Sequence, residues 1–134
     1  MPFKYEQSTG AFYRNGVLLA HGYSGNDAGK NDPNAQNIRS FGPIPRGKYT
    51  VSLPYYSSTH GPLVLRLSPA ISNQMFGRSG FLIHGDSIAH LGEASDGCII
   101  LDKATRKAIA DLKDFDLEVV SGIPSVVTTS KIDS

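Results

Sequence analysis

The stretch FLIHGDSIAHLGEASDGCIIL, residues 81–101, decides how this chain is interpreted. It opens with an apolar run that ends at His84, and it closes with Cys98 followed by a second apolar run. Short apolar runs bounded by Gly, Asp and Ser are typical of buried strands. We therefore expect two strands, Phe81–His84 and Cys98–Leu101, joined by a loop of polar and small residues.

The rest of the chain favours a mainly β fold. With 14 Gly, 8 Pro and aromatic and β-branched residues in short runs, the sequence is typical of short strands and many turns. The further strands expected are residues 3–7, 11–13, 17–20, 48–53, 63–67 and 117–120. Residues 22–42 show no sustained period and predict a long surface loop.

One short helix is expected after Asp102, which is a good N-cap residue. Apolar residues follow it at spacings of three and four, and they predict the buried face of that helix: Ala104, Ala108, Ile109 and Leu112.

Length and charge restrict the organisation and the partners. The chain has 134 residues, which predicts one domain over 1–121 and a C-terminal tail over 122–134. Its 13 basic and 12 acidic residues leave a net charge of +1, so nothing in the charge favours nucleic acid. No window approaches the roughly 20 apolar residues of a membrane span, and the start lacks a signal-peptide pattern. We expect synthesis in the cytoplasm and export by another route.

Cys98 is the only cysteine, so it cannot form an internal disulfide and its role is packing or reactivity. A thiolate is a strong nucleophile, His84 could take the thiol proton, and the Gly85 carbonyl could fix the tautomer of that histidine. Backbone N–H groups exposed at Gly97 could stabilise a negatively charged oxygen. The alternative is a small buried cysteine and a core histidine. A zinc site fits poorly, since ligand pairs at zinc spacing are absent from the sequence.

Two separated motifs resemble the L,D-transpeptidase family. The H-G pair followed by S-x-G-C-I, here 84–85 and 95–99, resembles the active-site signature, and GPIPRGKYTV resembles the T-P-x-G-x-Y segment. The resemblance is closest to the Tlde1 branch, which comprises type VI secretion effectors. It rests on GYSG, GPIP-x-G-x-Y, FGRSGFLIHGD and SDGCI, at residues 22–25, 42–49, 76–86 and 95–99.

The resemblance implies an L,D-transpeptidase-like β-sandwich or barrel with one short α-helix after the cysteine. It implies that Cys98 is the nucleophile, that His84 is the base, and that Gly97 and the Cys98 N–H form the oxyanion hole. Ser95 is expected either to hydrogen-bond His84 or to cap the turn before Gly97. Asp96 departs from the family pattern, because ordinary L,D-transpeptidases usually carry a histidine there.

Four further residues are candidates for substrate binding. Arg78 could hold a carboxylate, or form an ion pair with Asp86 or Asp96. Asp86 could bind an amine, although a role in holding its loop is favoured. Tyr23 and Ser24 could line a groove. The remaining histidines are expected to be surface or packing residues: His21, His60 and His90.

The expected function is cysteine-dependent L,D-carboxypeptidase or L,D-transpeptidase activity on peptidoglycan tetrapeptide stems. Cleavage at the bond between meso-diaminopimelate and D-Ala would release D-Ala or exchange it for another D-amino acid. No cofactor or metal is expected. The protein would be an antibacterial toxin active in the periplasm of a target bacterium and neutralised in the producer by an immunity protein. The alternatives are a non-catalytic peptidoglycan-binding module, a phage lysis enzyme and a metal-dependent peptidase.

Overall fold

Residues 2–122, the part of the chain that the structure describes, form short strands, one α-helix and two 3-10 helices in a computed structural model. In chain order the elements are β1 (Phe3–Glu6), β2 (Ala11–Arg14), β3 (Val17–His21), β4 (Tyr23–Ser24), η1 (Asp27–Gly29), η2 (Pro33–Ala35), β5 (Gly47–Val51), β6 (Tyr55–Ser57), β7 (Gly61–Pro69), β8 (Leu82–His84), β9 (Ile99–Ile100), α1 (Lys103–Leu112) and β10 (Asp116–Val120).

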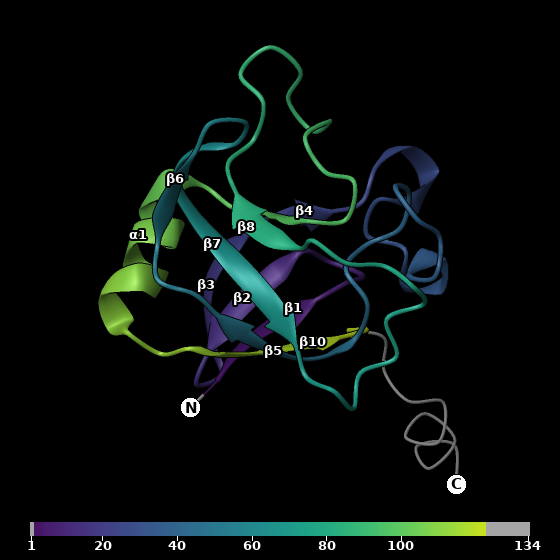
Figure 1. Cartoon of the computed structure of the whole chain (residues 1–134), viewed down its shortest axis with the longest axis horizontal. Coiled ribbons are helices and arrows are strands. Elements are labelled where there is room, and N and C mark those ends of the chain that lie inside the picture. The colour runs from purple at the N-terminus through teal and green to yellow at the C-terminus, as the bar shows by residue number, and fades with distance from the viewer. Residues whose placement is uncertain (1, 123–134) are drawn as a thin grey trace, which may run out of the picture.

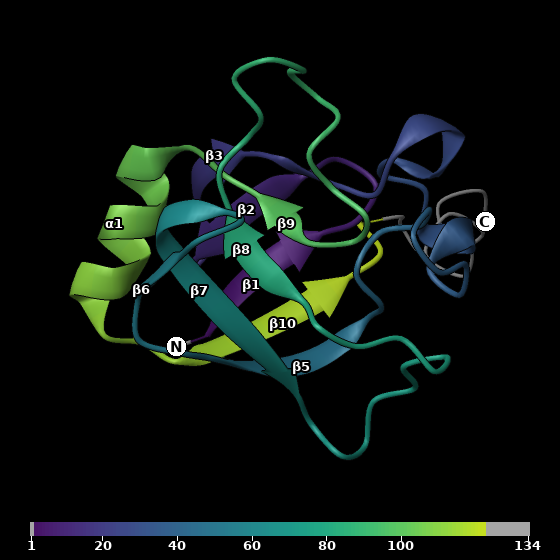
Figure 2. The ribbon, with the colours of Figure 1, turned by 45° about the horizontal axis from the view of Figure 1, so that its top comes forward.

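The strands form one strongly curved sheet in the order β3-β2-β1-β10-β5-β7-β8-β9-β4, and β6 pairs with β7 outside this path. The two ends of the sheet approach each other, because β3 and β4 are separated only by Gly22, whose N–H donates to the Gly10 carbonyl at 2.7 Å. The result is a nearly closed barrel with α1 on its outside (Figures 1 and 2). The mainly β fold with one α-helix is therefore confirmed.

The first and last strands lie side by side in the middle of the sheet. β1 pairs with β10 in parallel, with Phe3 opposite Leu117 and Tyr5 opposite Val119. β10 then pairs antiparallel with β5. Residues far apart in the sequence therefore share one hydrogen-bonded ladder.

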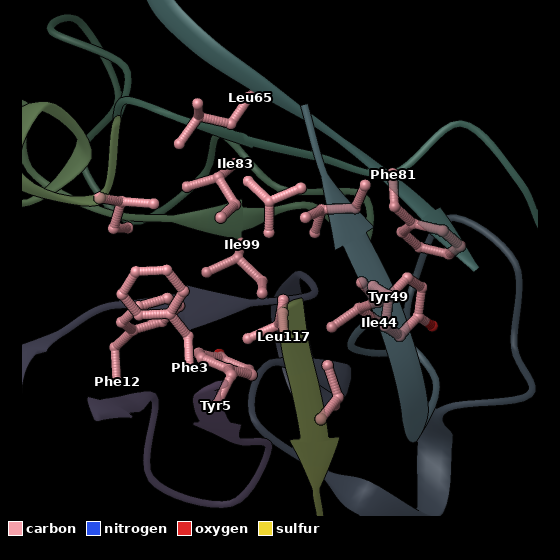
Figure 3. Close-up of a cluster of buried hydrophobic side chains, with 14 of the residues drawn as sticks. Phe3, Tyr5, Phe12, Ile44, Tyr49, Leu65, Phe81, Ile83, Ile99 and Leu117 are labelled. Carbon is pink, nitrogen blue, oxygen red and sulfur yellow. The ribbon is translucent and has the colours of Figure 1, made fainter. Parts of the chain in front are cut away.

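The core fills the inside of the barrel. Ile83 of β8 and Ile99 of β9 are paired in register and are both 0% exposed. Figure 3 shows them directed toward the same interior as Phe3, Phe12 and Leu117. The two strands predicted on either side of the polar stretch therefore do lie next to each other, anchored by their apolar side chains.

Helix α1 begins where the sequence predicts, but of its predicted buried face only Ile109 is buried. Asp102 is its N-cap, and the carboxylate accepts from the Thr105 N–H at 3.3 Å. The buried helical residues are Thr105, Arg106 and Ile109, whereas the predicted members Ala104, Ala108 and Leu112 are exposed. On the buried side, the guanidinium of Arg106 donates to the backbone carbonyls of Leu101, Pro62 and Leu63.

The predicted long loop over 22–42 was only partly correct. It contains β4, which pairs antiparallel with β9 so that Ser24 lies opposite Ile99, and it contains both 3-10 helices. Strand β6 was also not predicted. Two- and three-residue strands are too short to show a period. Most of the predicted tail, residues 123–134, lies outside the described residues, and within residues 2–122 no helix is long and apolar enough to cross a membrane.

Candidate active site

Strands β8 and β9 bring the predicted base and the predicted nucleophile to one face of the sheet. The two strands are parallel, with Ile83 opposite Ile99 and His84 opposite Ile100. Side chains alternate along a strand, so His84 lies on the face opposite to the core-directed Ile83. Cys98, which immediately precedes β9, shares that face.

The thiol of Cys98 is half-buried and is held by the neighbouring strand. Its Sγ accepts a hydrogen bond from the Leu82 N–H at 3.3 Å. Burial raises the pKa of Cys98, the Leu82 N–H opposes that rise, and the charges of Asp96 and Arg78 act in opposite directions. Because the net direction of the pKa shift is upward, the resting side chain is a thiol at neutral pH and needs a base to become a nucleophile.

The imidazole of His84 has the properties of such a base. It is 3% exposed, and its Nδ1 lies 2.8 Å from the Gly85 carbonyl oxygen. A carbonyl only accepts, so Nδ1 carries the proton and Nε2 keeps its lone pair in the neutral ring. Burial lowers the pKa of His84, and the positive charges of His60 and Arg106 lower it further, against the Gly85 carbonyl and the charge of Asp86. The ring is therefore neutral at neutral pH.

The His84 ring and the Cys98 thiol are not in direct hydrogen-bond contact in this structure. Within residues 2–122 no hydrogen bond joins the His84 ring to the Cys98 sulfur. Such bonds are often long or absent without substrate and form in the reacting complex.

Ser95 takes the capping role of its two predicted alternatives. Its Oγ donates to the Cys98 carbonyl at 2.6 Å and accepts from the Gly97 N–H at 3.0 Å and the Gly25 N–H at 2.9 Å. The Gly97 N–H is therefore already hydrogen-bonded to Ser95, whereas the predicted oxyanion hole would need it free to bind a substrate oxygen. Gly97 itself has φ +138°, and an added Cβ would lie 2.5 Å from Nη2 of Arg78, so only glycine fits there.

The GYSG segment supports the loops around the thiol. Tyr23 Oη donates to the Asp86 carboxylate at 2.6 Å and accepts from the Ala94 N–H at 2.9 Å. Ser24 is fully buried, and its Oγ donates to the Gly97 carbonyl and accepts from the Ile44 N–H, both at 2.8 Å. Ser24 is therefore a buried support, and neither side chain is part of the lining of the cavity beside Cys98; a role of Tyr23 in substrate binding stays a prediction.

The Asp86 carboxylate holds the loop between β8 and β9, which extends away from the sheet in Figure 1. It accepts from the Ser87 N–H at 2.8 Å and from the Gly92 N–H at 3.1 Å, in addition to the Tyr23 hydroxyl. This arrangement matches the loop role that the sequence favours for Asp86.

Arg78 binds backbone carbonyls. Its side chain is 6% exposed, and its Nη1 and Nη2 atoms each donate twice: to Gln36 O at 2.6 Å, Pro43 O at 2.8 Å, Gly42 O at 3.0 Å and Asp96 O at 3.1 Å. The guanidinium thus ties together three segments of the chain. Among the described residues it pairs with neither the Asp86 nor the Asp96 carboxylate, and its fork is not open to a ligand carboxylate.

A cavity of about 380 Å³ lies against the thiol. Its lining comes from residues 39–40, from residues 77–81 and from Asp96 and Cys98. His84 is not part of this lining. The sulfur therefore faces a volume at the small end of the range of ligand pockets.

Three residues of this region were not predicted from the sequence. His60 lies between β6 and β7, and its ring centroid is 4.4 Å from that of His84. Arg106 donates to the carbonyls of Pro62 and Leu63, and its Nη2 lies where a Cβ on Gly85 would be. Arg39 lines the cavity. Only folding brings these positions to the site, so no local spacing marks them.

Metal binding finds no support in the described part of the chain. Between residues 2 and 122, no group of three or more His, Cys, Asp or Glu side chains is arranged to hold an ion.

Comparison with known proteins identifies the family of the chain. A search of curated proteins gives no match. The model of the Tlde1 domain, a domain of L,D-transpeptidase-like type VI secretion effectors, matches residues 19–123. That range includes β8, β9 and all the residues that line the cavity. The chain therefore belongs to the Tlde1 domain family.

Proposed function

We propose that this protein is a cysteine-dependent L,D-carboxypeptidase and L,D-transpeptidase. Its substrate would be the tetrapeptide stem of peptidoglycan, cut between meso-diaminopimelate and D-Ala. The observation that carries the proposal is the position of the Cys98 sulfur at a cavity and on the same sheet face as a buried, neutral His84. Membership of the Tlde1 family supports peptidoglycan as the substrate class.

In the proposed reaction His84 Nε2 removes the thiol proton as Cys98 Sγ attacks the carbonyl carbon of the scissile amide. The carbonyl oxygen becomes negative and would be stabilised by backbone donors such as the Cys98 N–H. The C–N bond then breaks, the D-Ala nitrogen takes the proton from His84, and a thioester remains. Water or the amine of a second amino acid attacks the thioester and releases the Cys98 thiol.

Delivery would place this activity in the periplasm of a target bacterium. The Tlde1 family supports delivery by a type VI secretion system. We propose that residues 1–121 form the catalytic domain, that 122–134 form a tail, and that the producing cell carries an immunity protein against this toxin.

The direct test incubates the protein with purified tetrapeptide muropeptides, with and without a free D-amino acid, and reads the products by mass spectrometry. The expected products have lost one alanine, or carry the added amino acid in its place. The Cys98→Ala variant should form neither product. If wild type and variant both bind the muropeptide equally and neither changes it, the protein is a binding module and the proposed activity is wrong.

The charge of His60 should shift the pH dependence of the reaction. Neutral His84 is the active form, so kcat/KM rises with pH through the pKa of His84. That pKa is lowered by burial first and then by the charges of His60 and Arg106, against Asp86. Replacing His60 with Gln removes one positive neighbour, raises the pKa of His84 and moves the acidic limb to higher pH.

The measurement is kcat/KM for D-Ala release between about pH 5 and 8, the range in which histidines titrate. The matched control is His90→Gln, because His90 is exposed and pairs with Glu93 on the loop between β8 and β9. An acidic limb that stays in place in His60→Gln, or moves to lower pH, contradicts the assignment of His84 as the base.

A further inference from the structure

We propose that Arg39 and Asp96 form a subsite for the zwitterion of an amino acid beside the Cys98 thiol. The inference rests on the proposed function and deepens it: the subsite would hold the D-Ala that leaves the stem and the free amino acid that replaces it. Arg39 would bind the carboxylate of that amino acid, and Asp96 would bind its ammonium group.

The first support is the composition of the cavity. Its lining contains two cationic side chains, Arg39 and Arg78, one carboxylate, Asp96, and the thiol. The two terminal nitrogens of Arg78 already donate to four backbone carbonyls, so Arg78 forms part of the cavity wall and is not the group that binds a ligand carboxylate. Arg39 is exposed, and its Nη2 donates at 3.3 Å to the carbonyl of Gly77, which also lines the cavity. That leaves Arg39 as the guanidinium available to a carboxylate.

The second support is the position of Asp96. Its backbone carbonyl is fixed by Arg78, and its exposed carboxylate accepts from Asn26 Nδ2 at 3.1 Å. The carboxylate is also close enough to Cys98 for its charge to raise the pKa of that thiol. A negative charge next to the nucleophile does not help to form a thiolate. The Asp96 carboxylate would, however, stabilise a positive charge that forms next to the thiol during the reaction.

Such a charge develops in the proposed reaction. The scissile nitrogen is a neutral amide in the stem, and it becomes an amine when the C–N bond breaks and His84 returns the proton. A second proton from water makes it an ammonium, which the Asp96 carboxylate stabilises. Arg39 holds the carboxylate that the same D-Ala carries. The two charges of the product therefore meet two opposite charges.

Exchange uses the same subsite in reverse. An incoming amino acid binds with its carboxylate at Arg39 and its ammonium at Asp96, gives up a proton, and attacks the thioester through nitrogen. A new amide bond forms, the C–S bond breaks, and the Cys98 sulfur takes a proton. An acceptor with an amine but no carboxylate lacks the contact with Arg39. The subsite therefore selects amino acids over simple amines as acceptors.

The test compares D-methionine with D-methioninamide as acceptors in the muropeptide exchange assay. Wild type should prefer the free acid, and Arg39→Gln should reduce the ratio of acid to amide incorporation about tenfold, the effect of losing one charge-assisted hydrogen bond. Arg39→Lys, which keeps the charge, should restore part of the preference. Asp96→Asn keeps the acceptor for Asn26 and should lower incorporation of both compounds, because both carry an ammonium group.

Lys107→Gln and Asp111→Asn are the matched controls, since this exposed pair on α1 lies outside the cavity. They should leave the ratio at its wild-type value. A wild-type ratio in Arg39→Gln, with thermal melts that show a folded protein, overturns the subsite.

A binding arm separates this outcome from failure of the proposed function. NMR titration of the Cys98→Ala protein with D-methionine and its amide measures the subsite without turnover. Weaker binding of the acid alone after Arg39→Gln supports the subsite even if wild type forms no exchange product. Equal binding of acid and amide in both proteins overturns it.

Discussion

Replacing Cys98 with Ser lowers kcat/KM for D-Ala release by at least about 10³-fold, because the chemistry depends on the nucleophile. A hydroxyl is far less acidic than a thiol, and burial already raises the pKa of the Cys98 thiol, so His84 has little capacity to deprotonate an alcohol in this place. The substitution replaces the side-chain sulfur with oxygen and changes no other heavy atom. Kinetics on a tetrapeptide muropeptide, followed by mass spectrometry, measures the effect.

The fold of Cys98→Ser should be unaffected, which isolates the chemical effect. The serine oxygen can accept from the Leu82 N–H as the sulfur does. We expect the free energy of unfolding to change by less than about 1 kcal/mol, as for a conservative change at a half-buried site. Activity above one tenth of wild type in this variant shows that Cys98 is not the nucleophile.

Replacing Arg78 with Met lowers the free energy of unfolding by about 3–5 kcal/mol, because buried carbonyls lose their donors. The guanidinium is the common partner of four carbonyls in the segments around Gln36, Gly42 and Asp96. Met keeps an unbranched, flexible side chain but is shorter and donates nothing. Thermal unfolding should occur roughly 12–20 °C below wild type, given the usual relation between unfolding free energy and melting temperature for a domain of this size.

Two further variants make this prediction specific. Arg78→Lys should fall between wild type and Met, since an ammonium group has three donors and lacks the planar fork. Arg66→Met is the control, because Arg66 is exposed and contacts the Tyr55 ring, with its guanidinium carbon 5.0 Å from the ring centroid. Its melting temperature should stay within a few degrees of wild type. Equal melting of Arg78→Met and wild type contradicts the assignment of Arg78 as a support.

Much of the fold could be predicted because its signals are local. Apolar runs such as those ending at His84 and starting after Cys98 predict strands without reference to the rest of the chain. Asp102 likewise marks the start of α1. The mainly β class followed from composition and short apolar runs, and the family followed from short motifs that are each contiguous in the sequence.

The functions of individual motif residues could not be predicted in the same way. The sequence around Ser24 fits an exposed serine in a Gly-rich loop equally well. In the structure Ser24 is fully buried between two backbone groups. Arg78 was expected to meet a carboxylate, because the charge of a residue is visible in the sequence and the carbonyls around it are not. His60 and Arg39 reach the site from separate loops, and no spacing links them to Cys98.

The parallel pairing of β1 with β10 also determines when the protein can acquire its structure. During synthesis the residues of β1 leave the ribosome before those of its partner strand β10, Asp116–Val120. One edge of β1 therefore stays unpaired until β10 has been made. Such long-range pairing slows folding. Until β10 has been made, the sheet that carries Cys98 is therefore incomplete. The producing cell is exposed to the assembled site only after β10 has been translated.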